Sequence, residues 1–231
     1  MKKYTPLTIA ILGGTGNEGR GLALRWGQGG VEILIGSRER GKAERVAQEL
    51  NERLGTPRGI PRLRGFDNRE AAASASIVVS TLPHQGHRDM LASLRDELED
   101  KLLMVATVIW PPGPMDRPSA AEEAQAVLGD GVRVVAAFQT VSALALQAID
   151  KEMEEDVLVC GDDGAACEEA LDYMRRGGLR GIKSGPLKHA RIAEAITALM
   201  LAINKGYGVK SAGIHVTGLE PWSPTSSSTS S

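Results

Sequence analysis

The feature that most constrains the fold is a glycine-rich turn near the N-terminus. The apolar run Leu7–Leu12 predicts a buried strand, and Asn17–Gln28 predicts an amphipathic helix. Between and into them, Gly14, Gly16 and Gly19 match the pattern G-x-G-x-x-G. In this context the first glycine allows the tight turn, the second admits a pyrophosphate close to the backbone, and the third lets the helix pack against the strand. The helix N-terminus then offers N–H groups and a positive dipole end to the phosphates.

Apolar runs and amphipathic stretches alternate along the first part of the chain. Strands are predicted at Leu7–Leu12, Val31–Ile35, Ile77–Thr81, Leu102–Ile109 and Val132–Phe138. Helices are predicted at Asn17–Gln28, Arg40–Leu54, His84–Leu98 and Ala120–Leu128. Glycine and proline predict loops at Gly55–Gly65 and Pro111–Pro114. This order predicts an α/β protein with a Rossmann-type, doubly wound parallel sheet and helices on both faces.

The remainder of the chain predicts a smaller C-terminal α/β domain. Strands are expected at Asp156–Cys160 and Leu179–Ile182, with a helix at Ala165–Arg176 between them. The helix Arg191–Asn204 is the most apolar in the chain, so we expect it to be buried on the first domain or on a second subunit. The expected organisation is residues 1–140 for dinucleotide binding, 141–220 for the small domain, and a disordered Ser/Thr/Pro-rich tail at 221–231.

Composition excludes several other classes of function. The formal net charge is −2, so nothing favours binding to nucleic acid or to an anionic membrane. No apolar stretch approaches the roughly 20 residues that span a bilayer, and the N-terminal run is too short for a signal peptide. We therefore expect a cytoplasmic protein.

Few side chains outside the glycine turn suggest chemistry of their own. Cys160 and Cys167 are not spaced as zinc ligands or as a disulfide framework, so buried, inert thiols are expected. No metal site is expected, and His84 is better interpreted as a surface or cofactor-lining residue than as a ligand. Asp162 and Asp163 precede a predicted helix and favour a turn with an N-cap.

The end of the second predicted strand indicates which dinucleotide binds. A protein that binds NAD usually has Asp or Glu there, to bond the ribose 2′-hydroxyl. This chain has Ser37 at that position, followed by Arg38, with Lys42 one helical turn later. A guanidinium and an ammonium suit a 2′-phosphate, which a carboxylate would repel. The pattern therefore predicts NADP(H) rather than NAD.

Four sequence tracts together resemble a known family. They are Ile11–Asn17, Gly36–Arg38, the Val-Cys-Gly-Asp-Asp tract Val159–Asp163, and Ser184–Leu187 followed by the long apolar helix. The first two are common to many Rossmann proteins, whereas the last two are more specific. Over Leu7 to Leu219 the chain resembles the NADPH-dependent reductases of coenzyme F-420 (F420), the F420:NADP oxidoreductases.

The resemblance implies a mechanism and a set of binding residues. It implies direct hydride transfer between NADP(H) and the deazaflavin F420, with the protein aligning the two cofactors, no catalytic acid or base, and a homodimer. NADP(H) would contact Gly14, Thr15, Gly16, Asn17, Glu18 and Gly19 at the pyrophosphate, Ser37, Arg38 and Lys42 at the 2′-phosphate, Leu82, Pro83 and His84 on the ribose and adenine side, and Ala143 at the nicotinamide amide. Val108, Gln139 and Val141 would face the deazaflavin.

Two departures from the family pattern leave alternatives open for the acceptor. Gln139 stands where the family often has histidine, and glutamine donates hydrogen bonds without carrying charge. The segment Ile109–Pro112, which includes Trp110, is bulkier than expected beside the cleft. An NADPH-dependent reductase of a flavin, or of a small imine or ketone, is one alternative. A binding protein that senses NADP(H) without turnover is another, from a different class.

Overall fold

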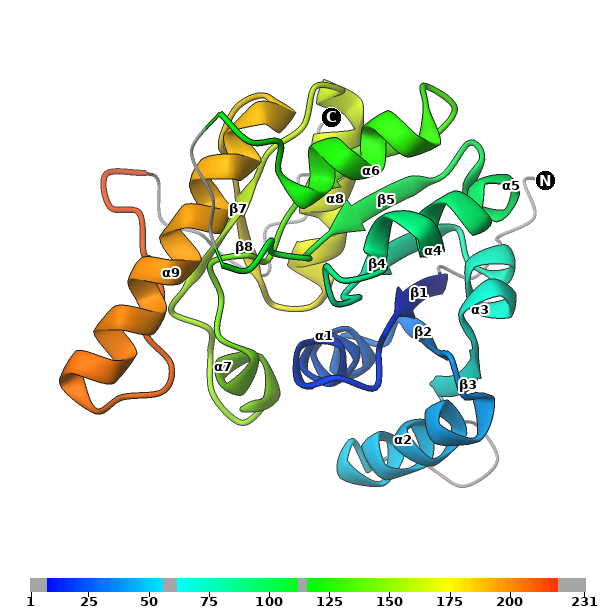
Figure 1. The fold of residues 1–231 in the computed structure, drawn as a ribbon. Coiled ribbons are helices and arrows are strands. Elements are labelled where there is room, and N and C mark those ends of the chain that lie inside the picture. Colours follow the sequence, from blue (N-terminus) through cyan, green and yellow to red (C-terminus); the bar gives the residue numbers. More distant parts are fainter. Residues whose placement is uncertain (1–7, 56–61, 112–115, 220–231) are drawn as a thin grey trace, which may run out of the picture.

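The computed structural model describes residues 8–55, 62–111 and 116–219. Within these ranges the main sheet has six parallel strands in the order β3-β2-β1-β4-β5-β6 (Figure 1). They are β1 (Thr8–Leu12), β2 (Glu32–Ser37), β3 (Leu63–Asp67), β4 (Ile77–Ser80), β5 (Leu102–Val105) and β6 (Arg133–Ala136). Ile9 pairs with Ile33 of β2 on one side and with Ile77 of β4 on the other. Strands β2 and β3 are added on one side of β1, and β4, β5 and β6 on the other side. This reversal of the order in which strands join the sheet confirms the predicted doubly wound fold.

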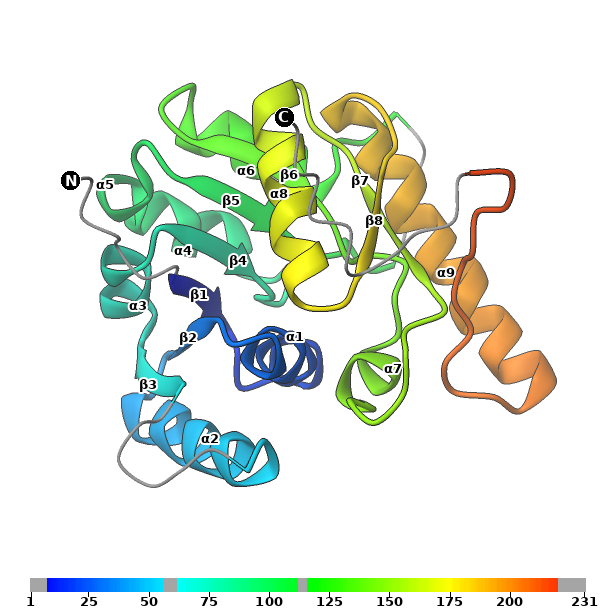
Figure 2. The ribbon, with the colours of Figure 1, turned by 180° about the vertical axis from the view of Figure 1, so that it is seen from behind.

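Side chains alternate between the two faces of the sheet, and each face has its own helical layer. One hydrophobic cluster joins Ile9, Ile33 and Val79 to α1 (Asn17–Gln28), α2 (Arg40–Arg53) and α8 (Gly164–Arg176). The opposite cluster joins Ala10, Leu34 and Val78 to α3 (Asn68–Ser74), α4 (His87–Ser93), α5 (Arg95–Leu98) and α6 (Ala120–Leu128). Figure 2 shows α8 on the reverse side of the view in Figure 1. Because helices cover both faces, the inner strands are buried along nearly their whole length, as expected for a parallel sheet of this kind.

A small parallel sheet continues the fold beyond β6. It consists of β7 (Asp156–Val159) and β8 (Arg180–Lys183), joined by α8. Ala136 and Cys160 form an antiparallel bridge, so β7 approaches the main sheet at β6. Asp163 caps α8 by accepting hydrogen bonds from the backbone N–H groups of Ala165 and Ala166 at 2.8 and 3.2 Å, which confirms its predicted role.

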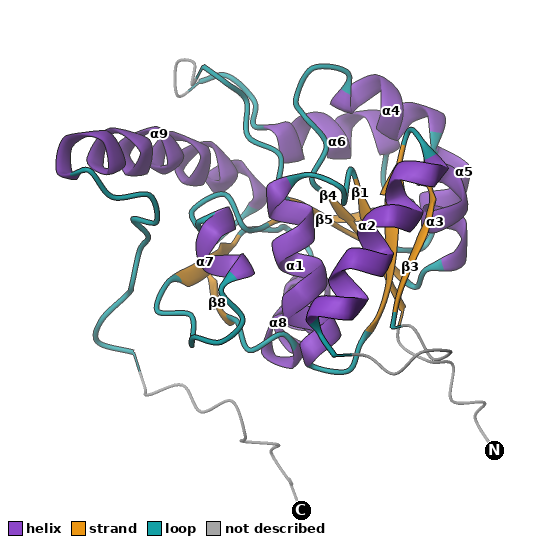
Figure 3. Cartoon of the chain, turned by 90° about the horizontal axis from the view of Figure 1, so that it is seen from below, coloured by secondary structure: helices purple, strands orange, loops and turns teal. Residues whose placement is uncertain are grey.

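The last long helix, α9 (Ala190–Tyr207), follows the 3-10 turn η1 (Leu187–His189) and extends away from the sheet (Figure 3). Its first turns are anchored. Glu194 is 6% exposed and accepts hydrogen bonds from the backbone N–H groups of Ala120 at 2.7 Å and Ile109 at 3.2 Å. Beyond these turns Leu199 is 56% exposed, so the expected burial on the first domain is wrong for this part of the helix, and burial on a second subunit stays a prediction.

Several element boundaries differ from the sequence expectation. The predicted loop Gly55–Gly65 ends earlier, because β3 begins at Leu63 and is followed by α3, and neither element was predicted. The predicted helix His84–Leu98 is two helices, α4 and α5, and His84 lies before them. The strands predicted at Leu102–Ile109 and Val132–Phe138 are shorter. Short α7 (Ala143–Gln147) was not predicted. Part of the proline loop and the predicted tail lie outside the described residues.

Candidate functional site

The glycine turn joins the carboxyl ends of three neighbouring strands. The N–H of Gly14 donates to the carbonyl of Ile11 at 3.1 Å and to that of Gly36, in β2, at 3.0 Å. A Cβ placed on Gly13 would lie 3.2 Å from a side-chain carbon of Leu82, after β4. A Cβ on Gly19 would lie 2.5 Å from the Cα of Gly14, so the helix and the turn pack without room for a side chain. The turn is thus held at the switch point of the sheet, where dinucleotides bind in open α/β folds.

The N-terminus of α1 lacks a cap from its own sequence. Gly16 is the N-cap residue and offers no side-chain acceptor. By contrast, Ser119 and Glu122 form a capping box at the start of α6. The first N–H groups of a helix need acceptors, and a phosphate is one such acceptor. The uncapped end of α1, at Gly16 and Asn17, therefore suits the pyrophosphate of a dinucleotide.

Two cations at the end of β2 stand without ion-pair partners among the described residues. Arg38 and Lys42 are exposed and form no ion pair within these ranges. Arg40, between them, is engaged: its guanidinium contacts Glu44 at 2.9 Å and Glu70 at 2.6 Å. Ser37 is buried, and its Oγ accepts a hydrogen bond from the N–H of Glu39 at 3.2 Å. Arg38 and Lys42 are therefore available to bind an anion, whereas Arg40 is already paired with carboxylates.

Asn68 supports this region and was missed by the sequence analysis. It is the first residue of α3, is 4% exposed, and its Oδ1 accepts the N–H of Gly13 at 3.2 Å. A Cβ on Gly36 would lie 2.7 Å from the same oxygen. The signal that could identify Asn68 is the pair Asp67–Asn68, which is typical of a helix start, but the stretch Gly55–Gly65 before it predicts a loop and no strand.

The residues after β4 contact the end of β5. Leu82 is buried, and its carbonyl accepts a hydrogen bond from Thr107 Oγ1 at 2.8 Å. Pro83 is exposed. His84 is half-buried, with Nε2 3.1 Å from a carboxylate oxygen of Glu123 in α6. The predicted ribose and adenine residues thus lie at the same sheet edge as the glycine turn, with His84 turned toward α6.

The chain after β6 is strained and holds buried polar groups. Phe138 is buried with a φ of 78°, in the left-handed region that non-glycine residues rarely adopt. Gln139 is 4% exposed, and its Nε2 donates to the carbonyl of Val105 at 2.8 Å. No partner among the described residues bonds its Oε1. The neighbouring Val108 and Val141, predicted to face the second substrate, are partly exposed.

Short helix α7 brings Ala143 close to the phosphate helix. Ser142 caps α7 by accepting the N–H of Leu144 at 3.2 Å, and Ala143 is its first residue. Gln147 at its other end donates through Nε2 to the carbonyl of Asn17, the first residue of α1, at 2.8 Å. The candidate nicotinamide residue and the candidate pyrophosphate residues are therefore held on two helices in direct contact (Figure 1).

Glu18 is the one acidic side chain within the glycine pattern. Burial raises the pKa of its carboxyl group from 4.5 to about 8. The side chain is half-buried, and desolvation favours its neutral form, whereas the positive end of the α1 dipole favours the carboxylate and limits the rise in pKa. A neutral carboxyl group at this position does not repel a pyrophosphate.

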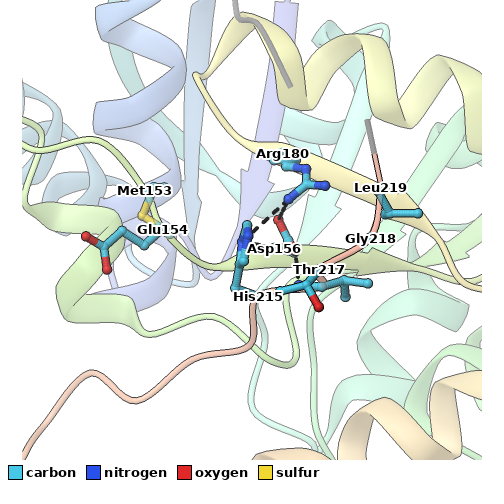
Figure 4. Close-up of a pocket in the computed structure, with 9 residues that line it drawn as sticks. Met153, Glu154, Asp156, Arg180, His215, Thr217, Gly218 and Leu219 are labelled. Atoms are coloured by element: carbon cyan, nitrogen blue, oxygen red, sulfur yellow. Dashed lines mark hydrogen bonds and ion pairs between the residues drawn. The ribbon is translucent and has the colours of Figure 1, made fainter. Parts of the chain in front are cut away.

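A separate pocket lies beside β7 and contains none of the predicted site residues (Figure 4). Asp156 is 1% exposed and lies 3.3 Å from the guanidinium of Arg180 and 3.5 Å from Nδ1 of His215. It also accepts the N–H of Val216 at 2.6 Å. These contacts hold the segment 214–219 against β7, so the cluster secures the C-terminal part of the described chain.

Comparison with known proteins gives concordant matches. Residues 8–108 match a family described as NADP oxidoreductase, coenzyme F420-dependent. The chain is 40% identical to the F420-dependent NADP reductase of Methanothermobacter thermautotrophicus, over 95% of this chain and 98% of that protein. It is 37% identical to the F420-dependent NADP reductase of Methanocaldococcus jannaschii, over 93% of this chain and 100% of that protein.

A solved structure shows the same fold. The crystal structure of a candidate F420-dependent NADP reductase from Arthrobacter sp. FB24 superposes with a TM-score of 0.73 at 23% identity, covering 90% of this chain and 98% of that one. In addition, no helix among the described residues is long and apolar enough to cross a membrane.

Proposed function

This chain belongs to the family of F420-dependent NADP reductases and is therefore an oxidoreductase; on that premise we propose that it transfers hydride between NADP(H) and coenzyme F420. The observation that carries the proposal is the 40% identity to such a reductase over 98% of its length. The two cofactors supply the redox chemistry when bound, so the protein's task is to bind, orient and shield them.

The residues of the site fit the adenine and phosphate half of NADP(H). The uncapped α1 N-terminus and the glycines that leave no room for Cβ atoms suit the pyrophosphate. Arg38 and Lys42 suit the 2′-phosphate, and Ser37 replaces the carboxylate that would repel it. Desolvation raises the pKa of the Glu18 carboxyl group, which lowers the negative charge that a pyrophosphate beside it would meet. We therefore propose these residues as the NADP(H) contacts.

The other half of the site is assigned to the hydride transfer itself. We propose that Ala143 holds the nicotinamide amide, and that Val108, Gln139 and Val141 form the wall facing the deazaflavin. The left-handed turn at Phe138 and the fixed amide of Gln139 make this wall rigid. A rigid wall serves a direct hydride transfer, since the reacting carbons must meet at about 3–3.5 Å.

The first experiment tests the acceptor. Purified protein is mixed with NADPH and oxidised F420, and the loss of deazaflavin absorbance is followed, with FAD and FMN in parallel reactions. We expect rapid reduction of F420 and slow or no reduction of the flavins. Tight NADPH binding without F420 turnover would contradict the proposal and favour another acceptor or a nucleotide sensor.

A second experiment tests the dinucleotide preference with a matched control. Arg38→Ala and Lys42→Ala should each raise the KM for NADPH about tenfold or more, because each removes a charge-assisted contact worth about 1.5–3 kcal/mol. The KM for NADH should change little. Arg40→Ala is the control, because Arg40 is already paired with Glu44 and Glu70. An equal effect of all three substitutions would argue for a general electrostatic role.

We further propose that α9 pairs with a second copy of the chain to form a homodimer, which the family resemblance also implies. Apolar residues exposed on α9 support this proposal; they are Ile192, Leu199, Leu201 and Tyr207.

We also propose that the protein works in the cytoplasm. The thiols of Cys160 and Cys167 are buried, and desolvation raises their pKa values, so they suit a reducing compartment. Within the chain, we propose a domain boundary near residue 140.

A further inference from the structure

Arg25, in the last turn of α1, is a buried cation bonded to backbone carbonyls. It is 5% exposed. Its Nε donates to the carbonyl of Leu146 at 3.0 Å, and its two terminal nitrogens donate to those of Lys151, Ala145 and Ala148, each at 2.8 Å. The four acceptors belong to the C-terminal end of α7 and the turn after it. A planar guanidinium, with five donors in a fixed fork, is the side chain suited to collect them.

The bonds from Arg25 are part of a longer contact between α1 and the chain after β6. A Cβ on Gly21 would lie 2.5 Å from Cβ of Leu146, so the helices touch without an intervening side chain. Trp26 packs edge-on against Phe138, with ring centroids 5.8 Å apart. The bond from Gln147 to the carbonyl of Asn17 extends the contact to the first residue of α1.

The two partners of this contact carry the two halves of the proposed cofactor site. α1 begins at the glycine turn proposed for the pyrophosphate, and α7 begins with Ala143, proposed for the nicotinamide. The interior of the molecule would accommodate an apolar side chain at residue 25 at a lower desolvation cost than a guanidinium. What the guanidinium adds is a fixed separation between the two helices.

We propose that Arg25 is a positioning residue of the hydride-transfer site, which holds α7 on α1 and so fixes the distance between the pyrophosphate and nicotinamide subsites. The inference rests on the proposed function, because it assigns the two subsites to NADP(H). Arg25 contacts neither reacting cofactor. Its effect should appear in the placement of the nicotinamide and not in the binding of the adenine half.

The test separates the two halves of the cofactor. In Arg25→Lys, an ammonium cannot serve four carbonyls in one plane, so α7 loosens. We expect the Kd for adenosine 2′,5′-bisphosphate, which lacks the nicotinamide, to stay within about twofold of wild type. The Kd for NADPH should rise, kcat should fall about tenfold or more, and the isotope effect with NADPH deuterated at C4 should increase. Arg176→Lys, an exposed arginine on α8, is the matched control.

Two further variants keep the inference testable if Arg25→Lys does not fold. Gln147→Ala removes only the bond to Asn17 at the edge of the contact, and Gly21→Ala pushes Leu146 away. Both should shift the ratio of the NADPH and bisphosphate Kd values in the same direction. A lower melting temperature with unchanged ratio and kcat would overturn the inference. If wild type does not reduce F420, the proposed acceptor fails, while the Kd ratio still reports on the positioning role.

Discussion

Helices α1 and α9 differ in a way that their sequences alone do not suggest. α1 contains three glycines and two arginines, yet most of its residues from Gly19 to Gly27 are buried. α9 has the more apolar sequence, yet its buried residues are confined to Ala190, Ala193 and Glu194 in the first turns. An amphipathic pattern indicates which face of a helix is apolar. Whether that face is buried depends on which other element packs against it.

The contacts of the two helices explain the difference. α1 lies between the sheet and α7, where glycines permit close approach and Arg25 satisfies carbonyls at the helix end. α9 is anchored in its first half, by Glu194, by the ion pair of Arg191 with Glu122 at 2.6 Å, and by Thr197 Oγ1, which donates to the carbonyl of Gln139 at 2.7 Å. The region around α1 is therefore packed within one chain, whereas the far part of α9 exposes apolar side chains such as Leu199 and Leu201.

The largest effect should follow from placing a side chain inside the α1 region. Gly19→Ala puts a Cβ 2.5 Å from the Cα of Gly14, so α1 must move away from the turn. We expect a loss of about 3 kcal/mol in the free energy of unfolding, with loss of NADPH binding. Denaturant unfolding and calorimetry measure the two effects. Gly41→Ala is the control, because its Cβ meets no atom nearer than 3.6 Å. A stable Gly19→Ala that binds NADPH would contradict the close packing.

Acid should destabilise the sheet region before it affects α9. His87 is fully buried, its Nε2 lies 3.1 Å from Ser80 Oγ, and desolvation lowers its pKa from 6.5 to about 4. The unfolded chain therefore binds a proton between pH 6.5 and 4 that the folded chain does not, so stability falls as pH decreases through this window. The loss from this residue is about 2 kcal/mol at pH 5. In His87→Gln, which does not titrate, the pH slope attributable to this residue should vanish, and an unchanged slope would place the acid sensitivity elsewhere.

The anchor of α9 should have a smaller effect than either change in the sheet region. Glu194→Ala leaves the N–H groups of Ala120 and Ile109 buried without their acceptor, which should cost about 1–2 kcal/mol. Native-state hydrogen exchange should show faster opening of α9 while α1 stays protected. Lys205→Ala, exposed at the far end of the same helix, is the control. Equal loss of protection in both helices would mean that they unfold as one unit.

The sequence predicts the fold correctly where a local pattern is compatible with only one backbone structure. The glycine pattern, the strand alternation around β1 and the N-cap at Asp163 are confirmed, because each depends on backbone chemistry within a few residues. β3 was missed because its alternation is interrupted by Arg64 and Gly65, and burial of this edge strand depends on α2. Arg25 and Asn68 were missed for a related reason: their partners lie 120 and 55 residues away, at Ala145 and Gly13, and no local pattern encodes such contacts.

The smallest effect on the single chain, and the sharpest test of the comparison, should come from the exposed part of α9. Leu199→Lys changes a side chain that is 56% exposed, so the stability of one chain should change by no more than about 0.5 kcal/mol. The same change places a charge in the proposed contact with a second copy, which should lower the dimer fraction at a given concentration. In sedimentation, wild type should have twice the chain mass of 24.5 kDa, and the variant should shift toward the mass of a single chain. Leu144→Lys, 51% exposed on α7, is the matched control and should leave the mass unchanged. A monomeric wild type would mean that the apolar residues of α9 are exposed in solution. The contrast between buried α1 and exposed α9 would then hold for the protein in solution and not only for a subunit taken from a dimer.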